Sequence, residues 1–115
     1  MSKALLQTYL RTHRKRSGLS QQEVAELIAA VSGTTVYRHE ASHRSLSLAD
    51  AFTYEALFSV PASALFPGEY RKARALIEAR AIALLEKLAR SGKDTSGTWQ
   101  KRLFLEGLVR RVRNT

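Results

Sequence analysis

The sequence predicts an all-α protein, in which five helices form a bundle and two further helices follow it. Apolar residues recur at spacings of three and four along most of the 115-residue chain, as on the buried face of a helix. The alternation of apolar and polar residues that marks strands is missing. Hydrophobic residues make up 44% of the chain, which is enough for a core of ordinary size.

The first helix is expected over about residues 3–17, and Gly18 ends it because glycine readily adopts the left-handed conformation found after helix ends. A second helix follows, since Ser20 and Glu23 have the spacing of a capping box. In that motif the serine oxygen accepts from a free backbone amide, and the glutamate reaches back to the amide of the serine. The inward-facing residues expected on these two helices are Leu6, Leu10, His13, Val24, Ala25 and Ile28.

The third helix is expected to begin between Ser32 and Thr34 and to end near Glu40, after a short turn. We expect Val31, in that turn, to join the core with the helix. The inward-facing positions of the helix itself are expected to be Val36, His39 and Glu40. The polar segment that follows, Ala41–Leu46, is expected to form a loop.

The fourth helix is expected to run from a cap at Ser47 to about Phe58. Pro61 suits the first turn of a short fifth helix ending near Phe66, because proline lacks the amide that a first turn leaves unpaired. The core candidates of the fourth helix are Ala51, Tyr54, Leu57 and Phe58. Pro67-Gly68 is the clearest boundary, and it divides a domain of residues 1–67 from an extension of residues 68–115.

The extension is expected to form two helices, Glu69–Arg90 and about Thr98–Arg113, joined by a turn. Trp99 and Leu103 lie outside the apolar stripe of the second helix, which suggests another contact surface. These helices carry more apolar surface than one hairpin can bury, so we expect either a homodimer or packing against the bundle. Their two stripes are Tyr70, Ala73, Ile77, Ala81, Leu84 and Leu88, and Phe104, Leu105, Leu108, Val109 and Val112.

The chain has a formal net charge of +9, from 19 Lys and Arg residues against 10 Asp and Glu residues. Residues 1–45 carry +4, residues 46–67 carry −2 and residues 68–115 carry +7. This excess predicts attraction to a polyanion, either nucleic acid or an anionic membrane surface. The absence of cysteine excludes disulfides and fits a reducing cytoplasm. No apolar run is long enough to span a bilayer, and the N-terminus turns polar too soon for a signal peptide.

An ordered series of residues carries a family resemblance: Arg14, Gly18, Leu19-Ser20-Gln21, Val24-Ala25, Val31-Ser32, Glu40, Ser47-Leu48 through Val60, and Leu65-Phe66. With this series, residues 6–66 resemble the phage-repressor-like helix-turn-helix family, also called the XRE family. The resemblance implies a five-helix, lambda-repressor-like helix-turn-helix bundle whose third helix enters the major groove of DNA. It also implies that Arg14 and Glu40 pair, tying the first helix to the end of the third.

The chain departs from the family pattern around the turn. The family usually has Gly-Val-Ser there, whereas this chain has Ala29-Ala30-Val31-Ser32, which is one residue longer and lacks glycine. Gly33 stands where the family often places a long base-reading side chain. Glycine cannot read a base through a side chain, although it permits close backbone approach. Ala41-Ser42 replaces the Asn-Gly that usually follows the glutamate.

The residues expected to contact DNA lie at the start of the second helix, along the third helix and in the following loop. Arginine prefers the O6 and N7 atoms of guanine, and threonine offers a hydroxyl or a methyl group to thymine. A glutamine at the start of the second helix can donate to a backbone phosphate. The alternative for each residue is an ordinary solvated surface. The candidates are Gln21, Ser32, Gly33, Thr34, Thr35, Tyr37, Arg38, His43 and Arg44.

The function expected from these observations is a sequence-specific transcriptional regulator that binds double-stranded DNA as a homodimer, in the cytoplasm of a bacterium or as a phage-encoded protein at the nucleoid. One alternative is an antitoxin-like or coactivator-like adaptor that binds a protein partner through residues 68–115. Another is a charge-driven binder of nucleic acid or anionic lipid. No enzyme is expected, because the sequence has no nucleophile with a base partner, no paired carboxylates on one helix face and no glycine-rich phosphate loop. No cofactor is expected, and no metal either, since His39 and His43 have ligand spacing but no third ligand completes a site.

Overall fold

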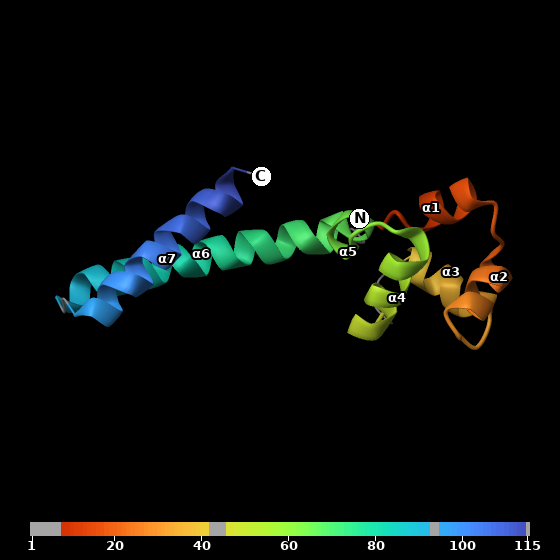
Figure 1. The fold of residues 1–115 in the computed structure, drawn as a ribbon, viewed down its shortest axis with the longest axis horizontal. Coiled ribbons are helices and arrows are strands. Elements are labelled where there is room, and N and C mark those ends of the chain that lie inside the picture. The colour runs from red at the N-terminus through yellow and green to blue at the C-terminus, as the bar shows by residue number, and fades with distance from the viewer. Residues whose placement is uncertain (1–7, 42–45, 93–94, 115) are drawn as a thin grey trace, which may run out of the picture. The chain divides into compact units, whose positions relative to one another are not determined.

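The computed structural model describes residues 8–41, 46–92 and 95–114. Within these ranges the chain forms helices joined by short turns and contains no strand, which confirms the all-α prediction (Figure 1). The helices are α1 (Leu10–Ser17), α2 (Gln21–Leu27), α3 (Gly33–Ala41), α4 (Leu48–Phe58), α5 (Ala62–Leu65), α6 (Pro67–Ser91) and α7 (Ser96–Arg113). The chain divides into two compact units, Met1–Tyr70 and Arg71–Thr115.

The first unit is held together by one apolar core to which each of its first five helices contributes. Figure 1 shows these five helices gathered as a cluster. Burial of such side chains is the main favourable term in folding. The buried members of the core are Leu10, Val24, Ala25, Val36, Tyr54, Leu65 and Phe66.

Helix α1 is shorter than the sequence predicts. Thr8 and Tyr9 lie outside the helix, which begins at Leu10. The backbone amide of Tyr9 donates to the carbonyl of Leu65 at 2.9 Å, so this part of the chain is tied to α5. Leu6 lies outside the described residues. The predicted end is confirmed, since Gly18 adopts the left-handed conformation with a φ of 76°.

Local capping starts both α2 and α4. The side-chain oxygen of Ser20 accepts from the amide of Glu23 at 3.0 Å, and the Glu23 carboxylate accepts from the Ser20 amide at 2.8 Å. Ser47 and Asp50 make the same reciprocal bonds at 3.0 and 3.1 Å. The predicted caps at both serines are therefore present, because the bonds depend only on residues three positions apart.

The turn between α2 and α3 corrects one prediction. Ala29 adopts a left-handed φ of 59°, and the amide of Ala30 donates to the carbonyl of Ala25 at 2.8 Å. This is a Schellman motif, which reverses the chain just after a helix. Ala30 then packs against the core, while Val31 is 95% exposed and does not join it. The motif turns the residue after Ala30 toward solvent, so the expected core position of Val31 is wrong.

Helices α4 and α5 follow the predicted bounds closely, ending at Phe58 and Leu65. Of the predicted core residues in α4, Tyr54 is fully buried, and Ala51, Leu57 and Phe58 are partly buried against the core. Helix α6 begins at Pro67, two residues before the predicted start at Glu69, so Pro67-Gly68 lies in its first turn. A proline at the first position of a helix loses no backbone hydrogen bond.

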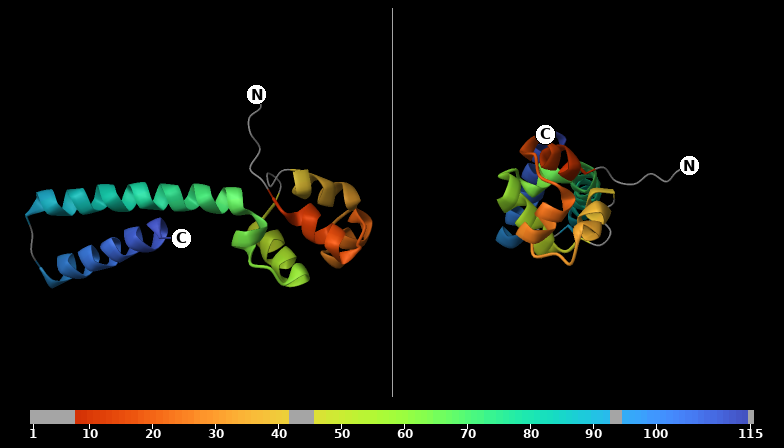
Figure 2. Two further views of the ribbon diagram at one scale, coloured as in Figure 1. Left: turned by 90° about the horizontal axis from the view of Figure 1, so that it is seen from above. Right: turned by 90° about the vertical axis from the view of Figure 1, so that its right-hand side faces the viewer.

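In the second unit, α6 and α7 run side by side in opposite directions (Figure 2). The guanidinium of Arg113 pairs with the carboxylate of Glu78 at 2.6 Å, and Arg74 donates to the carbonyl of Val112. Helix α7 begins two residues earlier than predicted, because Thr95 is its cap and accepts from the amide of Thr98. None of the described helices is long and apolar enough to cross a membrane.

The apolar stripes of this unit are only partly buried. Ala81 on α6 is buried, as are Thr98 and Leu105 on α7. Several large apolar side chains remain exposed, and Phe104 and Trp99 are 62% and 55% accessible. The others in this unit are Leu76, Ile77, Leu84 and Leu103.

Candidate nucleic-acid interface

Helix α3 lies across α2 at close range because small residues occupy the contact. Ala25 on α2 and Val36 on α3 are both buried. A Cβ atom at Gly33 would lie 3.2 Å from the backbone nitrogen of Gln22 and 3.3 Å from the carbonyl carbon of Gln21. The Gly33 amide also donates to the Gln22 side chain at 3.1 Å. Gly33 therefore brings the starts of α2 and α3 together, and the backbone that it approaches within the protein is that of α2.

Ser32 stabilises the start of α3. Its side-chain oxygen accepts from the amide of Thr34 at 3.2 Å, and its carbonyl accepts from the amide of Thr35 at 3.0 Å. These bonds satisfy amides that have no partner inside the helix. The candidate Ser32 thus has a structural role that is visible in the protein alone.

The outward-facing side of α3 presents Thr34, Tyr37 and Arg38, which are exposed and follow one another at helical spacing. Thr35 is partly buried at the edge of this face. Among the described residues, neither the Tyr37 hydroxyl nor the Arg38 guanidinium has a hydrogen-bonding partner. Three polar groups on one helix side are therefore available to a ligand outside the protein. The candidates His43 and Arg44 lie outside the described residues.

The opposite side of α3 is anchored by His39 as well as by Val36. The Nδ1 atom of His39 lies 2.8 Å from the hydroxyl of Tyr54, and the two rings meet edge to face. Burial raises the pKa of the Tyr54 hydroxyl. His39 is a buried, hydrogen-bonded core residue as expected, and the described residues contain no cluster of three or more side chains that could hold a metal.

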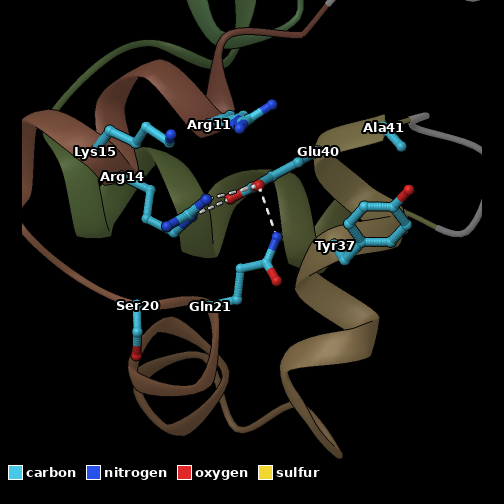
Figure 3. Close-up of a pocket in the computed structure, with 8 residues that line it drawn as sticks. All are labelled: Arg11, Arg14, Lys15, Ser20, Gln21, Tyr37, Glu40 and Ala41. Carbon is cyan, nitrogen blue, oxygen red and sulfur yellow. Dashed lines mark hydrogen bonds and ion pairs between the residues drawn. The ribbon is translucent and has the colours of Figure 1, made fainter.

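A pocket of about 560 Å³ adjoins the outward face of α3, between α1, the start of α2 and the end of α3 (Figure 3). An ion pair lies within it. Nε of Arg14 is 2.5 Å from one carboxylate oxygen of Glu40, and Nη2 is 3.2 Å from the other. The pair implied by the family resemblance is therefore present. The lining residues are Arg11, Arg14, Lys15, Ser20, Gln21, Tyr37, Glu40 and Ala41.

The charge of Glu40 is balanced by its neighbours. The side chain of Glu40 is 5% exposed and that of Arg14 is 12% exposed. The side-chain amide nitrogen of Gln21 also donates to the Glu40 carboxylate at 3.1 Å. The hydrogen bond with Glu40 raises the pKa of Arg14, although burial opposes this effect. Gln21, expected to contact a phosphate, thus uses one amide hydrogen within the protein and retains a second.

The pocket contains two cations that the sequence did not single out. Arg11 and Lys15 are exposed, lie four residues apart on α1 and line the same pocket as Tyr37. Their i, i+4 spacing is visible in the sequence, but it does not reveal which other helix they face. They contribute to the charge of +4 over residues 1–45, and the fold places these two cations in a pocket that α3 also lines.

Searches of protein-family models, curated proteins and solved structures find no match to this chain. The features of the protein that bear on its function are therefore its own residues and geometry. Helix α3 has one anchored side and one free polar side, and beside it lies a pocket with excess positive charge.

Proposed function

We propose that this protein is a sequence-specific regulator of transcription that binds double-stranded DNA. In this proposal α2 and α3 form the helix-turn-helix of a lambda-repressor-like bundle, and α3 enters the major groove. The observation that carries the proposal is the two-sided character of α3. Val36 and His39 hold one side to the core, while Thr34, Tyr37 and Arg38 occupy the other.

The chemistry of the free side suits base edges. The forked donors of Arg38 match the two acceptors of guanine in the major groove, and Thr34 can meet the hydrogen-bonding groups or the methyl group of a base. Helix α3 has nine residues and is therefore about 13 Å long, which is comparable to the width of the major groove. Several base pairs can lie within reach of one helix of this size.

The charge distribution supports the same function. Residues 1–45 contain the proposed reading helix and carry a net charge of +4. Positive charge near the reading helix attracts the phosphates on either side of the groove and accelerates association. A protein-binding adaptor has no need for this arrangement around α3.

The proposal includes pairing of two copies through α6 and α7. Exposed apolar residues of these helices border a groove of about 560 Å³, which is lined by Leu84, Gly97, Gln100, Lys101, Phe104 and Leu105. Two joined copies reach half-sites about 34 Å apart, which a single small unit cannot do. The adaptor function would instead place a different protein on this surface.

The function is tested by selecting duplexes from a random-sequence pool with the wild-type protein. A sequence-specific binder enriches one motif, and a homodimer enriches two inverted copies of it. The affinity for the enriched duplex is then compared with that for a random duplex of equal length. We expect a ratio of about 10³ or more at physiological salt. Binding without enrichment of any sequence would refute sequence-specific regulation.

A further inference from the structure

We propose that the pocket between α1, α2 and α3 binds one backbone phosphate of the same DNA duplex. Arg11 and Lys15 supply the positive charge, and the Tyr37 hydroxyl supplies a hydrogen bond. This inference rests on the proposed function and extends it to α1, none of whose residues was expected to contact DNA. Its basis is that these three side chains line one pocket, Arg11 and Lys15 from α1 and Tyr37 from α3 (Figure 3).

The pocket has an unbalanced positive charge. The Glu40 carboxylate already receives two hydrogen bonds from Arg14 and one from Gln21. This pairing compensates the only negative charge among the described residues that line the pocket. Arg11 and Lys15 therefore remain as two uncompensated cations, and the expected ligand is an anion.

Tyr37 indicates which anion the pocket receives. Its side chain belongs to the outward face of α3 and also lines the pocket, so the pocket adjoins the face proposed to read bases. A helix in the major groove has a sugar-phosphate backbone on either side of it. A cation pocket beside such a helix therefore meets a backbone phosphate when the helix is in the groove.

The size of the pocket also favours a phosphate that is part of a larger molecule. A volume of about 560 Å³ is far larger than one phosphate group, so a free anion would keep most of its water there. A duplex brings its neighbouring sugars with the phosphate and fills more of the space. The Arg14–Glu40 pair, joined to Gln21, then acts as a positioning group that holds α1 and α3 at the required separation.

The test combines protein variants with duplexes in which single phosphates are neutralised. The duplex selected by the wild-type protein is prepared as a series, each member carrying one uncharged methylphosphonate. The proteins are wild type, the double variant Arg11→Ala with Lys15→Ala, and Arg16→Ala as control. Arg16 is an exposed cation on α1 that does not line the pocket. Thermal melting checks that each variant is folded.

We expect one position in each half-site at which neutralisation weakens wild-type binding on the order of tenfold. Neutralising the phosphate at that position should weaken binding by the double variant only slightly. The same neutralisation should weaken binding by Arg16→Ala as much as it weakens binding by wild type. The double variant should also weaken binding to selected and random duplexes by similar factors. The slope of its plot of log affinity against log salt concentration should be smaller in magnitude by about one for each pocket that contacts a phosphate. Tyr37→Phe should weaken binding without changing this slope.

The outcomes separate the two proposals. If the wild-type protein prefers its selected duplex but the double variant is as sensitive as wild type at every position, the pocket does not bind phosphate and the proposed function stands. If the wild-type protein shows no preference among duplexes, both proposals fail. If inorganic phosphate binds at Arg11 and Lys15 but no methylphosphonate weakens DNA binding, the pocket binds a free anion. That result would overturn the proposed DNA contact.

Discussion

Arg38 and Thr34 are the side chains of α3 that are best placed to distinguish one base from another. We expect Arg38→Ala and Thr34→Ala each to reduce affinity for the selected duplex by about 1–3 kcal/mol, with little effect on a random duplex. The reason is that these side chains would pair with base edges, which only the correct sequence presents. Titration of both duplexes by fluorescence anisotropy measures the difference.

The matched control is Arg80→Ala, which removes an equal charge from an exposed site on α6. It should change the two affinities only slightly and by the same factor. If Arg38→Ala lowers the affinity for both duplexes equally, Arg38 contacts a phosphate instead of a base.

The Arg14–Glu40 pair lies almost out of solvent, so each partner depends on the other. Glu40→Ala leaves the Arg14 guanidinium with only the Leu19 carbonyl as a described partner. We expect a loss of about 3 kcal/mol in the free energy of unfolding, as when a buried ion pair loses one member. Urea unfolding followed by circular dichroism gives the value. Glu26→Ala, at an exposed site on α2, is the control and should have little effect. A loss below about 1 kcal/mol would show that the pair stabilises the fold no more than an exposed ion pair does.

Tyr54 makes stability depend on pH in the alkaline range. Burial raises the pKa of its hydroxyl above the unfolded value of about 10. Its protonated form is therefore favoured by folding, and this contribution is complete below pH 10 and lost as the pH rises above 10. We expect the free energy of unfolding to fall as the pH rises above 10, and to fall less steeply in Tyr54→Phe.

Tyr54→Phe should also be less stable at pH 8, because it removes the hydrogen bond to His39. Tyr37→Phe serves as the control, since Tyr37 is exposed, and it should reproduce the wild-type dependence. Parallel pH curves for wild type and Tyr54→Phe would show that ionisation of Tyr54 is not coupled to unfolding.

At the scale of single elements, the turn after α2 contains a strained residue. Ala29 adopts a φ of 59°, where a residue with a Cβ atom costs about 1–2 kcal/mol relative to the right-handed region. Ala29→Gly removes this strain but adds about 0.4–1 kcal/mol of chain entropy to the unfolded state. We therefore expect a net gain of about 0.5 kcal/mol, measured by urea unfolding.

The control for this element is Ala56→Gly, which replaces an exposed alanine in the last turn of α4. Its backbone is helical, so glycine there should cost about 0.5–1 kcal/mol. A loss in both variants would mean that Ala29 is not strained in solution.

At the scale of the whole molecule, the exposed apolar surface of α6 and α7 predicts a homodimer. Light scattering should give twice the chain mass of 12.9 kDa at micromolar concentration without DNA. Phe104→Glu should produce monomers, because Phe104 is 62% exposed and a buried carboxylate would oppose association. Leu48→Glu, at an exposed apolar site on α4, should leave the dimer intact. A monomeric wild-type chain would rule out a stable dimer.

The features that depend on residues close together in the chain could be predicted from the sequence alone. The caps at Ser20 and Ser47 and the stop at Gly18 were predictable, because each depends on hydrogen bonds or dihedral angles within a few residues. The inward positions Val24 and Val36 were also predictable, because helical spacing assigns each residue to a face. The same pattern identified α3 as the helix with a free polar side.

Features that depend on contacts between distant elements could not be predicted in this way, because those contacts exist only in the folded protein. Tyr9 leaves the helical conformation because its amide bonds to the carbonyl of Leu65, which no local pattern reveals. Val31 turns to solvent because Ala30 takes the inward position in a turn that lacks glycine. The pocket cations Arg11 and Lys15 line the same pocket as Tyr37 only because α1 and α3 come together in the fold. Spacing along a chain specifies the face of a helix, whereas the neighbour of that face depends on how the helices cross.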